Sequence, residues 1–225
     1  MPEQFELFAD PIPDDESPNS DAKPETTLQA SPRILYFDLE TQRGTQDVGG
    51  WSNIHKMGMA VGVVFDSIEE RMLTYLENEE QKLLRKLRSA DLVVGFNVKR
   101  FDYTVMQPYD PDFDLNEINT CDMLEHVEKK LGFRLGLNHL AQHTLGARKS
   151  ADGLVSLEWY REYKNTGDPA FMDRIVEYCK KDVEITRDLY LFGVQNGFIR
   201  YLSKGGIPQT MEVDWKPETL IPVRK

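Results

Sequence analysis

Apolar residues recur along most of this chain at the spacings of strands and helices. Apolar runs rich in β-forming residues predict strands at 33–40, 57–65, 71–76 and 91–97, with a hairpin turn at Asp66-Ser67 between the second and the third. The helical spacing of apolar residues predicts helices at 79–89, 120–131, 138–145, 156–163 and 168–194. Thr120 and Gly132 are the expected start and stop signals of the helix at 120–131. Strands covered by helices indicate an α/β fold with a mixed β-sheet flanked by α-helices.

The two ends of the chain differ in composition from its centre. Residues 9–32 hold five prolines among acidic and small polar residues, so we expect a disordered acidic tail at 1–32. We assign 33–205 to one folded domain, which suits a chain of 225 residues, and 206–225 to a short, loose C-terminal extension.

Composition excludes several classes of protein. Apolar residues make up 40% of the chain and aromatic residues 10%, enough for one hydrophobic core and too much for a fibrous or wholly disordered protein. No apolar run approaches the roughly 20 residues that span a bilayer, and the first thirty residues do not resemble a signal peptide. Cys121 and Cys179 lack the spacing of a metal site or a disulfide framework. We therefore expect a soluble cytoplasmic protein.

The net charge of −11 is unevenly distributed along the chain. Residues 1–30 hold eight acidic residues and one lysine, a net charge of −7, which leaves −4 for the other 195 residues. An acidic chain is not a generic coat for nucleic acid, but net charge does not decide what a local groove binds. Clustered carboxylates can hold cations that in turn bind phosphate, so the charge leaves the partner open.

Two carboxylates occupy the end of the first predicted strand. Asp38 and Glu40 are two residues apart, so their side chains point to the same face of the strand. Adjacent carboxylates repel each other unless a cation neutralises them, and Mg²⁺ commonly binds one or two carboxylates together with phosphate. The alternative is a strand end with solvated acids.

Two later segments add polar residues at comparable places. Asn97 closes the strand at 91–97 and Asp102 follows it, at the edge of an α/β sheet where ligands bind. Tyr178 and Asp182 are four residues apart on one face of the last helix, together with apolar Ile175 and Ile185. The alternative for the first pair is helix capping.

These segments resemble a known family. The sequences FDLET at 37–41, GFNVKRFDY at 95–103 and YCKKD at 178–182 are similar to the three motifs of the DEDD 3′–5′ exonucleases. The similarity is greatest to the proofreading domains of B-family DNA polymerases and to small stand-alone relatives, which implies a ribonuclease H-like fold. It also implies that Asp38, Glu40, Asp102 and Asp182 bind two Mg²⁺ or Mn²⁺ ions, and that Tyr178 is the tyrosine of the DEDDy branch.

The resemblance implies an enzyme that removes 5′-mononucleotides from the 3′ end of DNA, in DNA repair or replication. Thr41 and the main chain of Leu39–Glu40 would meet the terminal 3′ nucleotide, and we expect Asn97 and Phe101 to contact substrate as well. Core packing is the alternative for Phe101. Two other functions stay open: a 3′–5′ exoribonuclease in RNA processing, and a non-catalytic nucleic-acid-binding adaptor on the same fold.

The N-terminal segment Gln4–Phe8 places apolar residues in an otherwise polar tail. It resembles the Q-x-x-L-F motif that docks bacterial replication and repair proteins into the sliding clamp, with Gln4, Leu7 and Phe8 at the anchor positions and Phe5 where leucine is more usual. A short motif also arises by chance, which is the alternative. Docking would favour DNA as the substrate, because a flexible tether holds the nuclease near DNA.

A few polar residues outside the motifs also need an explanation. His139 and His143 have the spacing of a helical zinc pair without a third ligand, so we expect structural or substrate-lining roles. Asp122 is expected to cap a helix. Lys99, Arg100, Lys180 and Lys181 flank the motifs and are the basic residues best placed for phosphate contacts.

Overall fold

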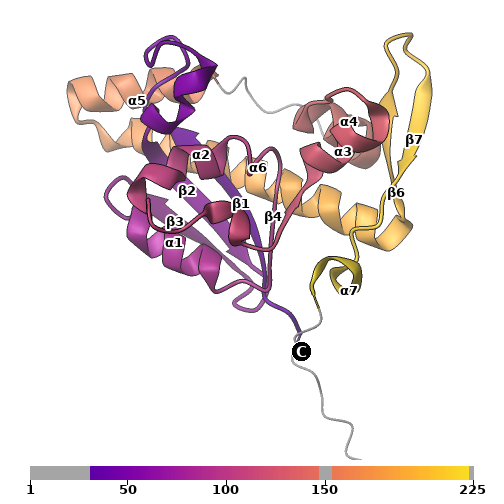
Figure 1. Ribbon diagram of the computed structural model, residues 1–225. Coiled ribbons are helices and arrows are strands. Elements are labelled where there is room, and N and C mark those ends of the chain that lie inside the picture. Colours follow the sequence, from indigo (N-terminus) through magenta and orange to yellow (C-terminus); the bar gives the residue numbers. More distant parts are fainter. Residues whose placement is uncertain (1–30, 147–153, 223–225) are drawn as a thin grey trace, which may run out of the picture. The chain divides into compact units, whose positions relative to one another are not determined.

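The computed structural model describes residues 31–146 and 154–222, and every structural statement below concerns these residues (Figure 1). The expected tail, with Gln4, Leu7 and Phe8, lies outside them apart from Ser31 and Pro32. In the described residues, no helix combines the length and the apolar composition that a membrane span requires.

A mixed five-stranded sheet forms the centre of the fold, which confirms the expected α/β class with a mixed sheet and flanking helices. Its strand order is β3-β2-β1-β4-β5, where β1 pairs antiparallel with β2 and parallel with β4. The strands are β1 (Ile34–Thr41), β2 (Met59–Asp66), β3 (Arg71–Leu76), β4 (Leu92–Gly95) and β5 (Thr120–Asp122).

Helices cover both faces of this sheet (Figure 1). The helices of the described residues are α1 (Glu80–Arg88), α2 (Asp102–Met106), α3 (Met123–Leu131), α4 (Leu137–Leu145), α5 (Leu154–Thr166), α6 (Pro169–Asn196) and α7 (Pro217–Leu220), with short 3₁₀ turns η1 (Trp51–Lys56), η2 (Gln107–Tyr109) and η3 (Leu115–Glu117). Because strand side chains alternate, Tyr36 of β1 packs in a core with α6, whereas Phe37 packs in a second core with α1 and α2.

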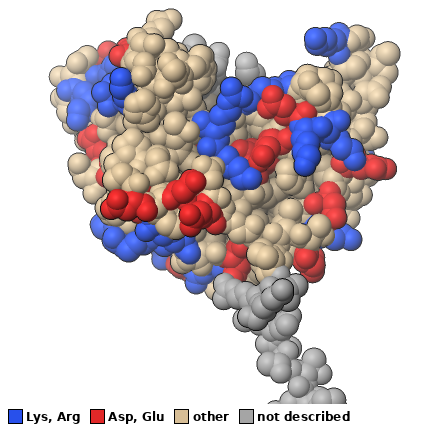
Figure 2. All heavy atoms as spheres, in the orientation of Figure 1, with Lys and Arg blue, Asp and Glu red and all other residues tan. Residues whose placement is uncertain are grey.

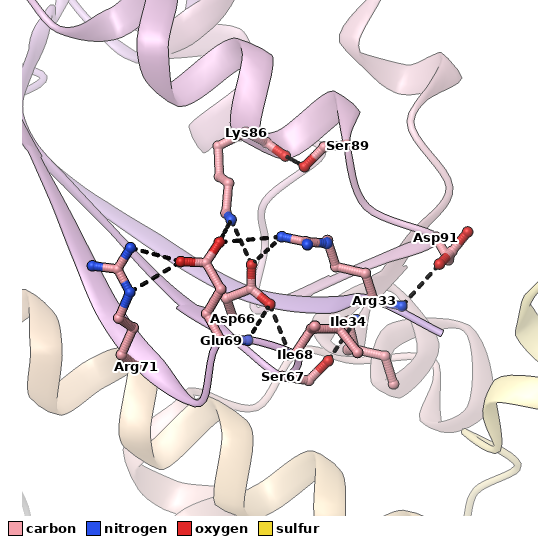
Figure 3. A network of polar contacts seen from close by, with 10 residues as sticks. All are labelled: Arg33, Ile34, Asp66, Ser67, Ile68, Glu69, Arg71, Lys86, Ser89 and Asp91. Atoms are coloured by element: carbon pink, nitrogen blue, oxygen red, sulfur yellow. Dashed lines mark hydrogen bonds and ion pairs between the residues drawn. The ribbon is translucent and has the colours of Figure 1, made fainter. Parts of the chain in front are cut away.

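An ion-pair network fixes the hairpin turn between β2 and β3 (Figure 3). The fully buried carboxylate of Asp66 accepts hydrogen bonds from Arg33 and Lys86, both at 2.5 Å, and from the backbone N–H of Ile68 at 2.8 Å. These contacts connect the turn to the start of β1 and to α1. The hairpin predicted at Asp66-Ser67 is therefore present.

The predicted helix at 120–131 begins later than expected. Residues 120–122 form β5, which pairs parallel with β4, and Asp122 rather than Thr120 is the N-cap. Its side chain accepts hydrogen bonds from Leu124 N and Glu125 N, so the expected capping role of Asp122 is confirmed. A strand of three residues is too short to show a period of two, so only the pairing with β4 identifies it.

Residues 206–222 are not loose, which corrects the expectation for this part of the C-terminal extension. Strands β6 (Phe198–Leu202) and β7 (Pro208–Glu212) form an antiparallel hairpin, and a boundary between 205 and 206 falls inside its turn. Beyond it, Trp215 is 1% exposed, stacks on Tyr190 and donates a hydrogen bond from Nε1 to His126 Nδ1 at 2.9 Å. Gly193 of α6 makes room for this indole, because a Cβ there would lie 2.4 Å from it.

Candidate active site

The structure brings the five predicted catalytic residues to one cavity at the carboxyl ends of β1 and β4. The cavity has a volume of about 600 Å³ and is lined by Asp38, Glu40, Asp102, Tyr178 and Asp182, among others. These residues come from β1, the first turn of α2 and the long helix α6, so three separate segments of the chain build the site.

Three carboxylates lie closest together. Asp38 and Glu40 lie on the same face of β1, and Asp182 reaches them from α6, which packs along β1. One oxygen of each lies within 4.8 Å of the other two. A β-bulge follows at Glu40/Thr41, where the register with β2 shifts. Oxygen ligands at this spacing suit a hard divalent cation, so the donor set fits Mg²⁺ or Mn²⁺.

Asp102 completes the acidic group from α2. It is the first residue of α2, is 2% exposed, and its Oδ1 accepts a hydrogen bond from Leu39 N at 3.2 Å. The carboxylate therefore lies against the backbone between Asp38 and Glu40. This position explains how a residue 62 positions beyond Glu40 joins the same cavity.

Burial and mutual repulsion disfavour the charged forms of these acids. Burial is the largest cause that raises the pKa of Asp38, followed by the charges of Asp102 and Asp182. Burial also raises the pKa of Asp102, with a contribution from Asp122, and it raises the pKa of Glu40 to about 8. Buried carboxylates of this kind are normally neutralised by protons, by cationic side chains or by metal ions.

Ser156 is a further polar residue at the cluster that the sequence analysis did not identify. It lies in α5, is 1% exposed, and its hydroxyl donates a hydrogen bond to Glu40 Oε2 at 2.5 Å. This bond lowers the pKa of Glu40 against the larger effect of burial. The contact joins residues 116 positions apart, and no sequence period indicates it.

Tyr178 lies one helical turn before Asp182. Burial raises the pKa of its hydroxyl far above the usual value, and the charges of Asp182 and Glu40 add to the effect. The phenol is therefore neutral at physiological pH, and its hydrogen bond with Asp182 also raises the pKa. The thiol of Cys179, between the two on the helix, donates to the backbone O of Asp38 at 3.4 Å and brings α6 close to β1.

Three of the four predicted substrate contacts line the cavity. Leu39 and Thr41 lie on β1, and the Thr41 hydroxyl donates to Arg43 O at 3.0 Å. Phe101 lies beside Trp51, with ring centroids 6.3 Å apart at 63°. Asn97 is different: it does not line the cavity.

The side chain of Asn97 points elsewhere. Its Oδ1 accepts a hydrogen bond from Arg134 at 2.6 Å, so it neither contacts the cavity nor caps α2. Its backbone has a positive φ of 68°, a conformation that asparagine tolerates. Asp122 fixes this turn by accepting from Asn97 N and Lys99 N, at 2.8 and 3.1 Å, and thereby helps to place Asp102.

An exposed tryptophan lies on the rim of the cavity. Trp51, which the sequence analysis did not identify, is 68% exposed. It follows Gly50, whose φ of 109° requires glycine, at the start of η1. The preceding loop is tied to α5 by an ion pair between Asp47 and Arg161 at 2.9 Å. No period or spacing in the sequence indicates this placement.

The other polar residues have local partners. His139 Nε2 accepts a hydrogen bond from Leu202 N at 3.1 Å, which supports a structural role. Lys99 pairs with Glu125, and Lys180 and Lys181 pair with acids one turn away on α6. Exposed pairs of this kind are weak, so they do not prevent contacts with phosphate.

Comparisons with known proteins agree with this architecture. The model of the RNase H superfamily matches residues 35–192. A solved structure of the family B DNA polymerase from the hyperthermophilic archaeon Pyrobaculum calidifontis is similar in fold, with a TM-score of 0.55 and 16% identity over 73% of this chain. The chain spans only about a quarter of that polymerase, because the match covers 25% of its length. A comparison with curated protein sequences found no match.

Proposed function

The chain belongs to the RNase H superfamily, and on that premise we propose that it is a metal-dependent 3′–5′ exonuclease of the DEDDy type that releases 5′-mononucleotides from DNA. One observation carries the proposal: Asp38, Glu40 and Asp182 place oxygens within 4.8 Å of one another in a cavity that Asp102 and Tyr178 also line. The fold likeness to a DNA polymerase supports DNA as the substrate.

The four acids would hold two Mg²⁺ or Mn²⁺ ions. When bound, such ions supply positive charge to the phosphate and lower the pKa of water, which in-line phosphodiester cleavage requires. Asp38, Glu40 and Asp182 are the nearest ligands to one another, and Asp102 would contribute from its place beside the backbone of Leu39. Ser156 would hold the Glu40 carboxylate in place through Oε2.

Tyr178 would act as a hydrogen-bond donor rather than as a base. Its raised pKa keeps the proton on the phenol oxygen at neutral pH, so the hydroxyl can orient the attacking water or the scissile phosphate. Leu39 and Thr41 would contact the terminal nucleotide, and the rings of Phe101 and Trp51 lie where a terminal base can stack.

The direct test is a cleavage assay. We expect 5′-labelled single-stranded DNA to be shortened from its 3′ end with Mg²⁺ or Mn²⁺ and to stay intact with chelator. A parallel RNA of the same sequence tests the exoribonuclease alternative, and binding without cleavage of either substrate would indicate the adaptor. The grouping of all four acids favours catalysis over the adaptor, because an inactive module has no need of buried like charges.

We also propose that Gln4, Leu7 and Phe8 dock the protein to a bacterial sliding clamp and so direct it to DNA repair or replication. The proposal rests on the sequence motif alone. A variant with Leu7→Ala and Phe8→Ala should lose clamp binding and cleave short oligonucleotides at the normal rate. If the unaltered protein has no affinity for the clamp, the docking proposal is wrong and the exonuclease proposal is unaffected.

A further inference from the structure

The C-terminal hairpin is a part of the chain that the family match does not include. The match ends at residue 192, before β6 and β7. The hairpin packs along α4, where Leu202 N donates to His139 Nε2 at 3.1 Å and Arg200 N donates to Thr144 Oγ1 at 2.9 Å. Two side chains of α4 occupy the free edge of β6. They fix the hairpin to the domain and keep this edge of β6 from pairing with another strand.

An aromatic pair connects this hairpin to the loop between α3 and α4. Phe133 of the loop is 39% exposed, and its ring lies edge-on to Tyr201 of β6, with centroids 6.4 Å apart at 66°. Ile207, in the hairpin turn, is 61% exposed. When a ligand covers apolar surface that is exposed in this way, the free energy of the complex is lowered. The hairpin and the loop thus present aromatic and aliphatic surface to solvent.

Arg134 connects the aromatic pair to the active-site cavity. It follows Phe133 in the chain, and its guanidinium donates to Asn97 Oδ1 at 2.6 Å. Asn97 in turn follows Phe96, which lines the cavity. One hydrogen bond, one ring contact and two steps along the chain therefore link the cavity residue Phe96 to Phe133 and Tyr201.

This route is basic in an otherwise acidic protein. The segments 97–100, 123–136 and 203–207 together hold six Lys or Arg residues and two Glu residues, a net charge of +4 in a chain whose total is −11. Figure 2 shows Lys and Arg side chains in the region of α3 and α4, with Asp and Glu side chains among them. The ion pair between Arg134 and Glu128 is exposed on both sides, so Arg134 can exchange it for a phosphate at little cost.

We propose that Asn97, Phe133, Arg134 and Tyr201 form an upstream track that binds the single strand leading into the active site, on the 5′ side of the nucleotide to be removed. The proposal rests on the proposed exonuclease function. Unpaired bases offer faces to aromatic rings while cations contact the backbone, whereas a duplex keeps its base faces stacked inside. The track therefore selects single-stranded 3′ ends several nucleotides long.

Binding measurements test the track directly. Fluorescence anisotropy with a labelled 12-nucleotide DNA, in chelator to prevent cleavage, compares Phe133→Ala and Arg134→Ala with the unaltered protein. Leu191→Ala and Arg71→Ala are matched controls, because both residues are exposed and lie outside the track. We expect about 10-fold weaker binding for each track variant, the scale of one lost base stack, and a change of less than about 2-fold for the controls.

Salt dependence separates the two contributions. Arg134→Ala should lower the slope of log K against log salt by about 0.7, the value for one phosphate contact of a single strand, whereas Phe133→Ala should leave the slope unchanged. RNA of the same sequence and a blunt duplex complete the series. The track predicts that either single strand binds more tightly than the duplex, and equal or tighter duplex binding would overturn it.

Cleavage gives an independent readout. The ratio of kcat/KM for the 12-mer to that for a dinucleotide, which is too short to reach the track, should fall about 10-fold in Phe133→Ala and Arg134→Ala. An unchanged ratio together with unchanged binding would overturn the track while the exonuclease proposal stands. If binding depends on the track but no substrate is cleaved, the track stands and the exonuclease proposal is overturned. If the protein binds none of the oligonucleotides, the track is overturned.

Discussion

Replacing Asp182 by asparagine should abolish cleavage without weakening the fold. One carboxylate oxygen of Asp182 lies within 4.8 Å of a carboxylate oxygen of Asp38 and of Glu40. Two unit charges at this separation repel each other by about 3 kcal/mol at an effective dielectric constant of about 20. Raised pKa values of Asp38 and Glu40 indicate that proton uptake relieves part of this repulsion. In chelator, we therefore expect the variant to be as stable as the unaltered protein or up to about 2 kcal/mol more stable.

Divalent metal should reverse this order of stability. A metal at 100 times its dissociation constant stabilises the unaltered protein by about 2.7 kcal/mol, and Asp182→Asn removes one ligand and most of that gain. For a chain of this size the gain corresponds to a rise in Tm of about 5–10 °C. Thermal unfolding followed by circular dichroism, in chelator and then in increasing Mn²⁺, measures both effects.

Glu184→Gln is the matched control for this experiment. Glu184 lies two residues further along α6, is exposed, and pairs with Lys181. Its replacement should leave both the metal response and the cleavage rate unchanged. The reasoning fails if Asp182→Asn is more than about 1 kcal/mol less stable than the unaltered protein in chelator, or if metal stabilises the two proteins equally.

Three further variants test separate parts of the structure. Tyr178→Phe keeps the packing and removes the hydroxyl, so the single-turnover rate should fall about 10²–10⁴-fold; an unchanged rate would make Tyr178 a packing residue. Ser156→Ala removes the donor to Glu40 and should raise the Mn²⁺ concentration needed for half-maximal activity, while Ser156→Thr should restore it. Burial raises the pKa of Asp66, but hydrogen bonds from Lys86 and the backbone outweigh it and lower the pKa overall. Asp66→Asn should therefore lower the free energy of unfolding by about 1–3 kcal/mol above pH 4. This difference should vanish as the pH falls through the depressed pKa of Asp66 in the folded state, and urea titrations at a series of pH values measure it.

Helices and strands whose apolar residues repeat at a regular spacing could be predicted from the sequence. Elements that are held by contacts with residues far away in the chain could not. The helix predicted at 168–194 is α6 at 169–196, because its apolar residues repeat over many turns. In contrast, β5 has three residues, and β6–β7 is interrupted by Pro208 and the glycines of its turn. The hairpin is held by His139 and Thr144 of α4, contacts that no local pattern reveals.

The same division applies to the site. The four acids and Tyr178 lie in short segments with characteristic spacing, and the structure places all five on one cavity. Ser156 reaches Glu40 across 116 positions, and nothing in its own segment distinguishes it from a solvated serine. Asn97 was expected at the cavity from its place after a strand, but its side chain does not line the cavity and accepts a hydrogen bond from Arg134 instead.

The unequal lengths of β1 and β4 explain why Asp102 belongs to the site at all. β4 pairs only with Ile34–Tyr36, so the second half of β1 has no strand on that side. The carboxylate of Asp102 takes the place of the missing strand by accepting the hydrogen bond of Leu39 N. Replacing it by alanine would leave a buried N–H without this partner, at a cost of about 1–3 kcal/mol. Lost activity in Asp102→Ala therefore combines a structural and a chemical effect, and a measurement of the free energy of unfolding beside the cleavage rate separates the two.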